Sequence, residues 1–191
     1  MAFKRKTFSI LLIGLLLGVV LGIEAVELGS NKNCPQIDGK GIEKIVVLND
    51  LDYAPQLIKV LTEASASIHV ATFELKYYKS FPESASNKII KQIIEAKKRG
   101  ADVKIIVDEY AKDNSAVPLL EENNVSVKFD GENQTLHSKL FLIDGKKVFV
   151  GSTNPTYYGL EKNREANVYI EDEKTAEKFE NWFDKIWISL L

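Results

Sequence analysis

From residue 42 onward, short apolar runs alternate with stretches in which apolar residues recur every three or four positions. A short apolar run bounded by polar residues is typical of a buried strand, and the three-to-four spacing is typical of an amphipathic helix. This order predicts an α/β fold in which a mixed β-sheet lies between helix layers. Strands are expected at residues 45–48, 68–73, 103–107, 125–129, 140–143, 148–150 and 168–170. Helices are expected at residues 55–66, 87–99, 118–123 and from 174 onward.

Local signals indicate several element boundaries. Asn87 is expected to cap the second helix, and Gly100 is expected to end it. The turn Asp144-Gly145-Lys146 separates two apolar runs, a pattern typical of a hairpin. The runs on either side of it are therefore expected to pair as antiparallel strands.

The N-terminus carries three basic residues at positions 4–6, followed by an apolar run at positions 8–23. This order is typical of a secretory signal peptide. As a helix the run spans about 24 Å, which is shorter than a bilayer core of about 30 Å, although flanking residues can extend it. A cleaved signal peptide and a retained membrane anchor therefore both stay open.

The chain is expected to have three parts: a signal peptide or N-terminal membrane anchor at 1–25, a polar linker at 26–41, and a folded domain at 42–191. With either kind of N-terminus, the basic flank stays in the cytoplasm and the rest of the chain crosses the membrane. We therefore expect the folded domain outside the cytoplasm, either secreted or periplasmic, or anchored to the membrane.

The composition excludes several classes of protein. The 25 basic and 27 acidic residues give a formal net charge of −2, which excludes a strongly basic surface over the whole domain. The single cysteine, Cys34, excludes an intrachain disulfide framework and a multi-cysteine zinc site. Two histidines leave little room for a histidine-rich metal centre, and we expect no metal and no cofactor. Cys34 is interpreted as a free thiol, with an interchain disulfide as the alternative.

A cluster of polar residues surrounds the predicted hairpin. His137 and Lys139 are two positions apart at the start of its first strand, so their side chains face the same way. Ser152 and Asn154 follow the second strand, which returns toward His137, and Glu165 lies in the next segment. An imidazole among ammonium, hydroxyl and amide donors can bind and attack a phosphate group. Glu165 could accept a hydrogen bond from one imidazole nitrogen and fix the tautomer.

The spacing of these residues resembles the HKD signature of the phospholipase D superfamily: His137-x-Lys139-x4-Asp144-x6-Gly151-Ser152-x-Asn154. Glu165 falls where that family has its active-site glutamate. The resemblance covers the chain from about residue 42 to the C-terminus and includes the strand order. It implies the phospholipase D-like α/β/α fold and a metal-independent phosphodiesterase that works through a phosphohistidine intermediate.

The resemblance also implies a role for each motif residue. His137 would be the nucleophile, Lys139 and Asn154 would bind phosphate oxygens, Ser152 would support the pocket, and Glu165 would orient the imidazole. The two remaining members of the motif are expected to be structural: Asp144 at the far end of the hairpin, and Gly151.

The chemistry of this family needs two histidines, one to attack and one to protonate the leaving oxygen. This chain has one HKD motif. Its other histidine, His69, lies within a predicted strand without a lysine two positions later, and we interpret it as a structural histidine. The second catalytic histidine is therefore expected from another copy of the chain, in a C2 homodimer with a composite active site.

Two loops are expected to form a substrate rim: one with Lys76 and Tyr77, the other with Tyr157 and Arg164. Aromatic side chains interleaved with basic ones suit the stacking of unpaired bases and the binding of phosphates, and equally suit a lipid head group. Solvated loops with packed tyrosines are the structural alternative.

Single-motif members of the family are small endonucleases and a membrane-anchored mitochondrial enzyme, which is described both as a cardiolipin hydrolase and as an RNA endonuclease. We therefore expect an endonuclease that cleaves DNA or RNA. A phospholipase D or cardiolipin hydrolase is the alternative, and a non-catalytic phosphate-binding protein is the third interpretation.

Overall fold

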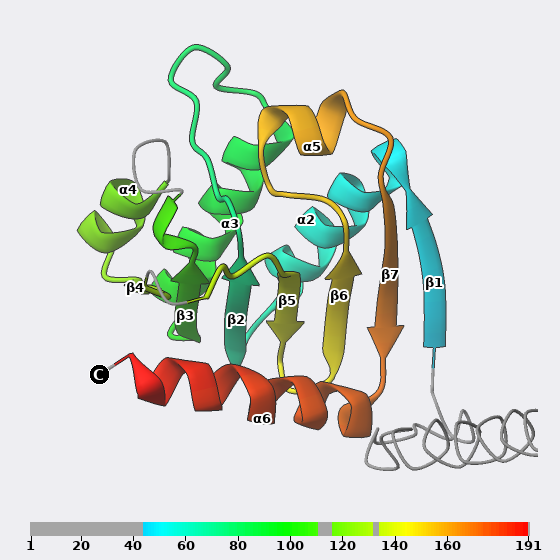
Figure 1. Ribbon diagram of the computed structural model, residues 1–191. Coiled ribbons are helices and arrows are strands. Elements are labelled where there is room, and N and C mark those ends of the chain that lie inside the picture. The colour runs from blue at the N-terminus through cyan, green and yellow to red at the C-terminus, as the bar shows by residue number, and fades with distance from the viewer. Residues whose placement is uncertain (1–43, 111–115, 132–133, 191) are drawn as a thin grey trace, which may run out of the picture. The chain divides into compact units, whose positions relative to one another are not determined.

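The computed structural model describes residues 44–110, 116–131 and 134–190 (Figure 1). Its strands are β1 (Lys44–Asn49), β2 (Ser67–Thr72), β3 (Asp102–Val107), β4 (Ser126–Phe129), β5 (Lys139–Ile143), β6 (Lys147–Gly151) and β7 (Ala166–Glu171). Its helices are the 3-10 helix η1 (Asp50–Asp52), α2 (Tyr53–Glu63), α3 (Ala85–Lys98), α4 (Val117–Glu122), α5 (Tyr157–Glu161) and α6 (Glu173–Ser189). Each predicted strand and helix is present, with ends displaced by three residues or fewer.

The strands form one mixed sheet in the order β1-β7-β6-β5-β2-β3-β4. β2, β3 and β4 are parallel, whereas β5 is antiparallel to both of its neighbours, β2 and β6. The predicted hairpin is confirmed, with Leu140 opposite Val150. This order brings the ends of β2 and β6 and the starts of β5 and β7 to one end of the sheet, the upper end in Figure 1.

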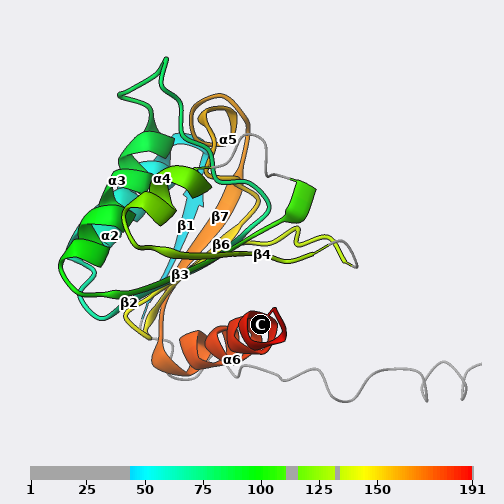
Figure 2. The same ribbon diagram turned by 90° about the vertical axis from the view of Figure 1, so that its left-hand side faces the viewer.

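Helices cover both faces of the sheet, as the amphipathic patterns predict (Figure 2). α2, α3 and α4 lie on one face, and α6 lies on the other. The alternation along β5 shows how one strand serves both layers, because its successive side chains point to opposite faces. Phe141 and Ile143 belong to the core under α2 and α3, and Leu140 and Leu142 belong to the core under α6.

The predicted cap of α3 is wrong by three residues. Ser84 is the N-cap, and its hydroxyl accepts a hydrogen bond from the backbone N–H of Asn87. The Asn87 side chain is buried and bonds instead to the preceding loop, where it donates to the carbonyls of Tyr78 and Phe81. Asn87 therefore stabilises the loop that links β2 to α3.

Two short elements, η1 and α5, are absent from the sequence prediction because neither is long enough to show helical periodicity. Among the helices in the described ranges, none is both long enough and apolar enough to cross a bilayer. The predicted signal or anchor segment, the linker and Cys34 lie outside the described residues.

Candidate active site

His137 and Lys139 lie at the start of β5, and both contact the ring of Phe73, which follows β2. The centroids of the Phe73 and His137 rings are 5.2 Å apart, and the Lys139 Nζ atom lies 5.4 Å from the Phe73 centroid. The backbone N–H of Phe73 donates to the carbonyl of Ser138 at 3.0 Å, which ties the two strand ends together. The two side chains therefore share one side of the strand, in line with their spacing.

The environments of the two side chains differ. Lys139 is only 4% exposed, and its ammonium donates to the carbonyl of His137 at 2.9 Å. Burial lowers the pKa of Lys139, while the negative charges of Glu165, Glu74 and Asp108 oppose that shift. His137 is exposed, and within the described residues its imidazole makes no hydrogen bond. The arrangement places an unbonded imidazole next to a cation.

Ser152 and Glu165 meet at the same end of the sheet, beyond β6 and before β7. The Ser152 hydroxyl donates to one oxygen of the Glu165 carboxylate, and the Asn163 amide donates to the other oxygen at 3.1 Å. Asn154 is half-buried, and its Oδ1 atom has no hydrogen-bond partner among the described residues.

Within the described residues, Glu165 makes no hydrogen bond to His137, so its expected role in orienting the imidazole stays a prediction. Both oxygens of Glu165 are occupied, by Ser152 and Asn163. The physical reason is the strand order: β6 separates β7 from β5, so Ser152 at the end of β6 lies nearer to Glu165 than the imidazole does.

Gly151 allows β6 and β7 to approach closely. A Cβ atom at this position would lie 2.7 Å from the Cα atom of Asn167, closer than side chains tolerate. Asn167 is buried, accepts from the backbone N–H of Thr153 at 3.2 Å, and donates to the Thr153 hydroxyl at 2.8 Å. Asn167 thus holds the turn between Gly151 and Asn154, a role that the sequence analysis missed.

Asp144 lies at the opposite end of the hairpin from His137. Its carboxylate accepts hydrogen bonds from three successive backbone N–H groups, those of Ser65, Ala66 and Ser67, at 3.1, 2.8 and 3.1 Å. These bonds join the hairpin turn to the connection between α2 and β2. Among the described residues, Asp144 makes no side-chain contact with the cluster around His137.

Asp108 is a second buried residue that the sequence analysis did not assign to the site. Its carboxylate accepts from the backbone N–H groups of Tyr110 and Leu136, both at 2.8 Å. Leu136 immediately precedes His137, so Asp108 positions the segment that carries the imidazole. Burial and the charge of Asp108 raise the pKa of the adjacent Asp130. An aspartate that directly follows a buried strand was the available signal.

The two predicted rim loops are joined. The backbone N–H of Lys76 donates to the carbonyl of Pro155 at 3.2 Å, and that of Tyr157 donates to the Tyr78 hydroxyl at 3.3 Å. Lys76 pairs with Glu74 at 2.9 Å.

The other two predicted rim residues, Arg164 and Tyr77, take no part in the hydrogen bonds between the two loops. Arg164 is 93% exposed and pairs with Asp50 at 2.7 Å. Tyr77 lines a hollow of about 310 Å³ with residues of α3 and α4 rather than facing the cluster at the start of β5.

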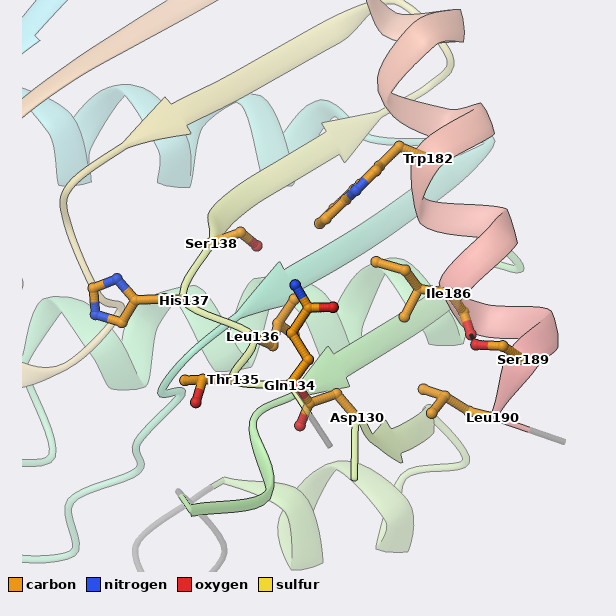
Figure 3. A pocket seen from close by; sticks show the side chains of 10 residues that line it. All are labelled: Asp130, Gln134, Thr135, Leu136, His137, Ser138, Trp182, Ile186, Ser189 and Leu190. Atoms are coloured by element: carbon orange, nitrogen blue, oxygen red, sulfur yellow. Dashed lines mark hydrogen bonds between the residues drawn. The ribbon is translucent and has the colours of Figure 1, made fainter. Parts of the chain in front are cut away.

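A cavity of about 540 Å³ lies beside the cluster, between Asp130 with residues 134–138 and the C-terminal half of α6. In Figure 3 the Ser138 side chain points toward Trp182, whereas the His137 imidazole points away from that residue. The Ser138 hydroxyl donates to the carbonyl of Ala71 at 2.8 Å. The imidazole is therefore at the margin of the cavity. Residues 44–110, 116–131 and 134–190 contain no group of three or more potential metal ligands.

His69 lies in the layer between β2 and α6, away from the cluster. Its Nδ1 atom is 2.6 Å from a Glu180 carboxylate oxygen, and its Nε2 atom is 3.4 Å from Asp102. The ring stacks on Phe183 with a centroid distance of 5.0 Å. Both ring nitrogens have partners, which is the arrangement of a structural histidine.

The chain resembles known proteins in sequence. Residues 57–187 match the family model described as "Cardiolipin synthase, PLD-like domain". The phospholipase D of Rickettsia typhi is 29% identical over 132 residues, which cover 68% of this chain and 60% of that protein. The mitochondrial cardiolipin hydrolase of Canis lupus familiaris is 28% identical over 134 residues, which cover 69% of this chain and 49% of that protein. The match thus spans about half to three fifths of these curated relatives.

Solved structures show the same fold. Nuc from Salmonella typhimurium, a phospholipase D family member, aligns with a TM-score of 0.66 and 24% identity, covering 75% of this chain and 93% of that one. NucT from Helicobacter pylori aligns with a TM-score of 0.65 and 24% identity, covering 78% and 98%. Because the family model also matches more than half of the sequence, the chain belongs to the phospholipase D superfamily, which includes phosphodiester hydrolases such as phospholipase D and cardiolipin hydrolase.

Proposed function

We propose that this protein is a metal-independent phosphodiesterase that works through a phosphohistidine intermediate, and that it is an endonuclease acting on DNA or RNA. One observation carries the proposal: the imidazole of His137, which is exposed and makes no hydrogen bond within the described residues, shares one side of β5 with the buried ammonium of Lys139. A nucleophile and a fixed positive charge are the two groups that attack on a phosphodiester requires.

In the proposed reaction, an imidazole nitrogen of His137 attacks phosphorus. A P–N bond forms, the bond to the leaving oxygen breaks, and a second histidine gives that oxygen a proton. Water then attacks the phosphohistidine, giving its proton to the second histidine, and the P–N bond breaks. Lys139 stabilises the negative charge that develops on the phosphate oxygens, and the side-chain N–H groups of Asn154 donate hydrogen bonds to the same oxygens.

The second histidine is proposed to be His137 of another copy of the chain. His69 is unsuitable because both of its nitrogens are engaged by Glu180 and Asp102 under α6. A C2 homodimer would bring two copies of the cluster together and form one composite site. Among the described residues the Oδ1 atom of Asn154 accepts no hydrogen bond, which is consistent with a site that a donor from a second subunit completes.

Subunit mixing tests the composite site. Co-expression with the inactive His137→Ala chain at a one-to-one ratio leaves about a quarter of the dimers with two histidines, and therefore about a quarter of the activity per chain. A protein that acts as a monomer would keep about half, and that result would contradict the dimer.

The two candidate substrates are nucleic acid and phospholipid. Aromatic and basic residues on the joined loops support nucleic acid, because bases stack on aromatic rings. The phospholipase D and cardiolipin hydrolase names of the sequence relatives favour the second candidate, a phosphodiesterase of phospholipid head groups. The apolar segment at residues 8–23 also fits a membrane location, and either form of it would place the activity outside the cytoplasm.

The deciding experiment uses the full-length protein, purified in detergent with EDTA present. It is incubated with single-stranded and duplex nucleic acid and with vesicles that contain cardiolipin, beside the His137→Ala variant. The proposal predicts cleavage of nucleic acid that persists in EDTA and is absent in the variant. Cleavage of cardiolipin alone would establish the second candidate instead.

A further inference from the structure

The loop between β2 and α3 and the segment around α5 together form a cluster of aromatic rings. We name Phe81, Tyr157 and Lys162 the platform. The Phe81 and Tyr157 rings stack with a centroid distance of 4.9 Å and an interplanar angle of 13°. Lys162 Nζ lies 5.1 Å from the centroid of the Tyr157 ring. Tyr78 contacts the edges of both rings and supports them from the side.

The platform is held firmly. Asn87 binds the carbonyls of Tyr78 and Phe81, at 2.8 and 3.0 Å, from the buried first turn of α3. The Glu161 carboxylate accepts from the backbone N–H of Ala85 at 2.7 Å and so joins α5 to α3. A preorganised ring stack loses little conformational entropy when a ligand binds.

One side of the platform is open. Phe81 is 49% exposed although Tyr157 already stacks on one of its faces. A flat ring in this position can continue its stack with one more flat ring. Lys162 adds a positive charge near that stack, which complements the negative charge of a phosphate backbone.

The platform lies next to the proposed catalytic cluster along the chain and in space. The backbone N–H of Thr156 donates to the carbonyl of Asn154 at 2.7 Å, and Tyr157 begins α5 directly afterwards. Gly159 packs against that same Asn154 carbonyl, where no side chain would fit. Asn154 is therefore linked to the platform by one short turn, because Tyr157 follows it by three residues and stacks on Phe81.

Resting on the proposed function, we propose that the platform stacks one unpaired base of a single-stranded nucleic acid while the neighbouring phosphate lies at His137. The large apolar side chains exposed on these two loops are all aromatic: Tyr77, Phe81 and Tyr158. A surface that inserts into lipid would present aliphatic side chains as well. The stacked geometry therefore favours a base over a membrane.

Binding is measured with the full-length protein in the His137→Ala background, so that the oligonucleotide stays intact. Phe81→Leu keeps the apolar character but removes the aromatic face, and it should weaken single-strand binding about tenfold. Phe81→Trp should retain the affinity. Tyr77→Leu makes the matched change on the same loop, in the hollow beside α3, and should leave the affinity unchanged. Affinity for duplex should not respond to Phe81→Leu.

The main result of a second measurement comes from protein in which Phe81 is intact, so it does not depend on how Phe81→Leu folds. An abasic position is moved along the oligonucleotide, and the protein with Phe81 intact should lose about tenfold in affinity at one position only. In Phe81→Leu the same abasic position should cause no further loss. Equal affinity of Phe81→Leu and its parent, or an even response along the strand, would overturn the platform.

Binding to vesicles that contain cardiolipin distinguishes base stacking from insertion of the loop into lipid. If binding to cardiolipin vesicles survives Phe81→Leu but falls in Phe81→Ala, the loop inserts into lipid and the base-stacking proposal is wrong. Cleavage of nucleic acid by protein that retains His137 distinguishes the failure of the platform from the failure of the proposed nuclease activity. Cleavage of nucleic acid that depends on His137 but not on Phe81 would overturn the platform alone, whereas no cleavage of nucleic acid would overturn the proposed nuclease.

Discussion

The Ser152 hydroxyl donates a hydrogen bond to the Glu165 carboxylate, and this bond joins the end of β6 to the start of β7. The same hydroxyl oxygen accepts from the backbone N–H of Ala166 at 3.1 Å. The single hydroxyl proton of Ser152 is therefore used to hold the Glu165 carboxylate. In this arrangement it is not available to a phosphate.

Ser152→Ala tests that relationship. The substitution leaves Glu165 with only the Asn163 amide as a side-chain donor, so the carboxylate is held less firmly. We expect kcat/KM to fall about tenfold while the melting temperature stays unchanged, because Ser152 is exposed. Steady-state kinetics beside thermal unfolding measure both. Glu165→Gln, which keeps an acceptor but removes the charge, should be more damaging, and a fully active Ser152→Ala would contradict this role.

Lys139→Met removes a buried charge and keeps most of the side-chain volume. Activity should fall at least about a hundredfold, because the phosphate loses its nearest cation. Stability should change by no more than about 1 kcal/mol, since burial already disfavours the charged amine and lowers its pKa. Urea unfolding and an activity assay measure the two effects. Lys147→Met, at the other end of the hairpin, is the matched control and should stay active. A large loss of stability with full activity would refute the assignment.

Asp144 should matter for stability. Asp144→Ala removes the acceptor of three backbone N–H groups and leaves alanine at a φ of +53°, so unfolding should become easier by about 2 kcal/mol. Asp144→Asn keeps an acceptor oxygen and tolerates that conformation, so it should lose less. Chemical denaturation measures the difference. Below the melting temperature, kcat should be unchanged in both variants, and a defect confined to kcat would show that Asp144 serves the chemistry.

The pairing of His69 makes the docking of α6 depend on pH. Burial favours the neutral imidazole, but the hydrogen bonds to Glu180 and Asp102 and the charge of Glu180 outweigh burial and the repulsion of Lys104, so the pKa of His69 is raised. The folded state then binds the proton more tightly than the unfolded state. The resulting stabilisation is fully present below the unfolded pKa of about 6.5 and is lost as the pH rises through the folded value.

Urea unfolding at several pH values measures this effect. The difference in stability between the wild-type protein and His69→Gln should be largest near pH 5.5 and should shrink toward pH 8.5. A difference that grows as the pH rises would show that the neutral imidazole is the stabilising form.

The sequence predicts the strands and long helices well because each carries its own periodicity. β5 illustrates this point, since its continuous apolar run already indicates burial on both faces. The HKD spacing likewise placed His137 and Lys139 on one side of a strand. Such patterns involve only residues that are close together in sequence, so the sequence alone reveals them.

The missed features depend on partners far away in the sequence. Phe73 reaches the cluster only because β2 pairs with β5, and Asp108 binds Leu136 across 28 residues. Asn167 matters because β7 lies against β6 at Gly151. The sequence predicts that Glu165 binds His137, whereas the strand order brings Ser152, at the end of β6, to Glu165.

The central claim is that His137 becomes covalently attached to phosphorus during turnover. The most direct test is to stop the reaction of the full-length protein with an oligonucleotide by adding an alkaline denaturant, which preserves a P–N bond. The modified peptide is then identified by mass spectrometry. The account predicts that the peptide containing His137 carries one cleaved fragment of the oligonucleotide, joined through its terminal phosphorus, with no such adduct in His137→Ala. Turnover without any adduct on that peptide, or an adduct on another residue, would contradict it.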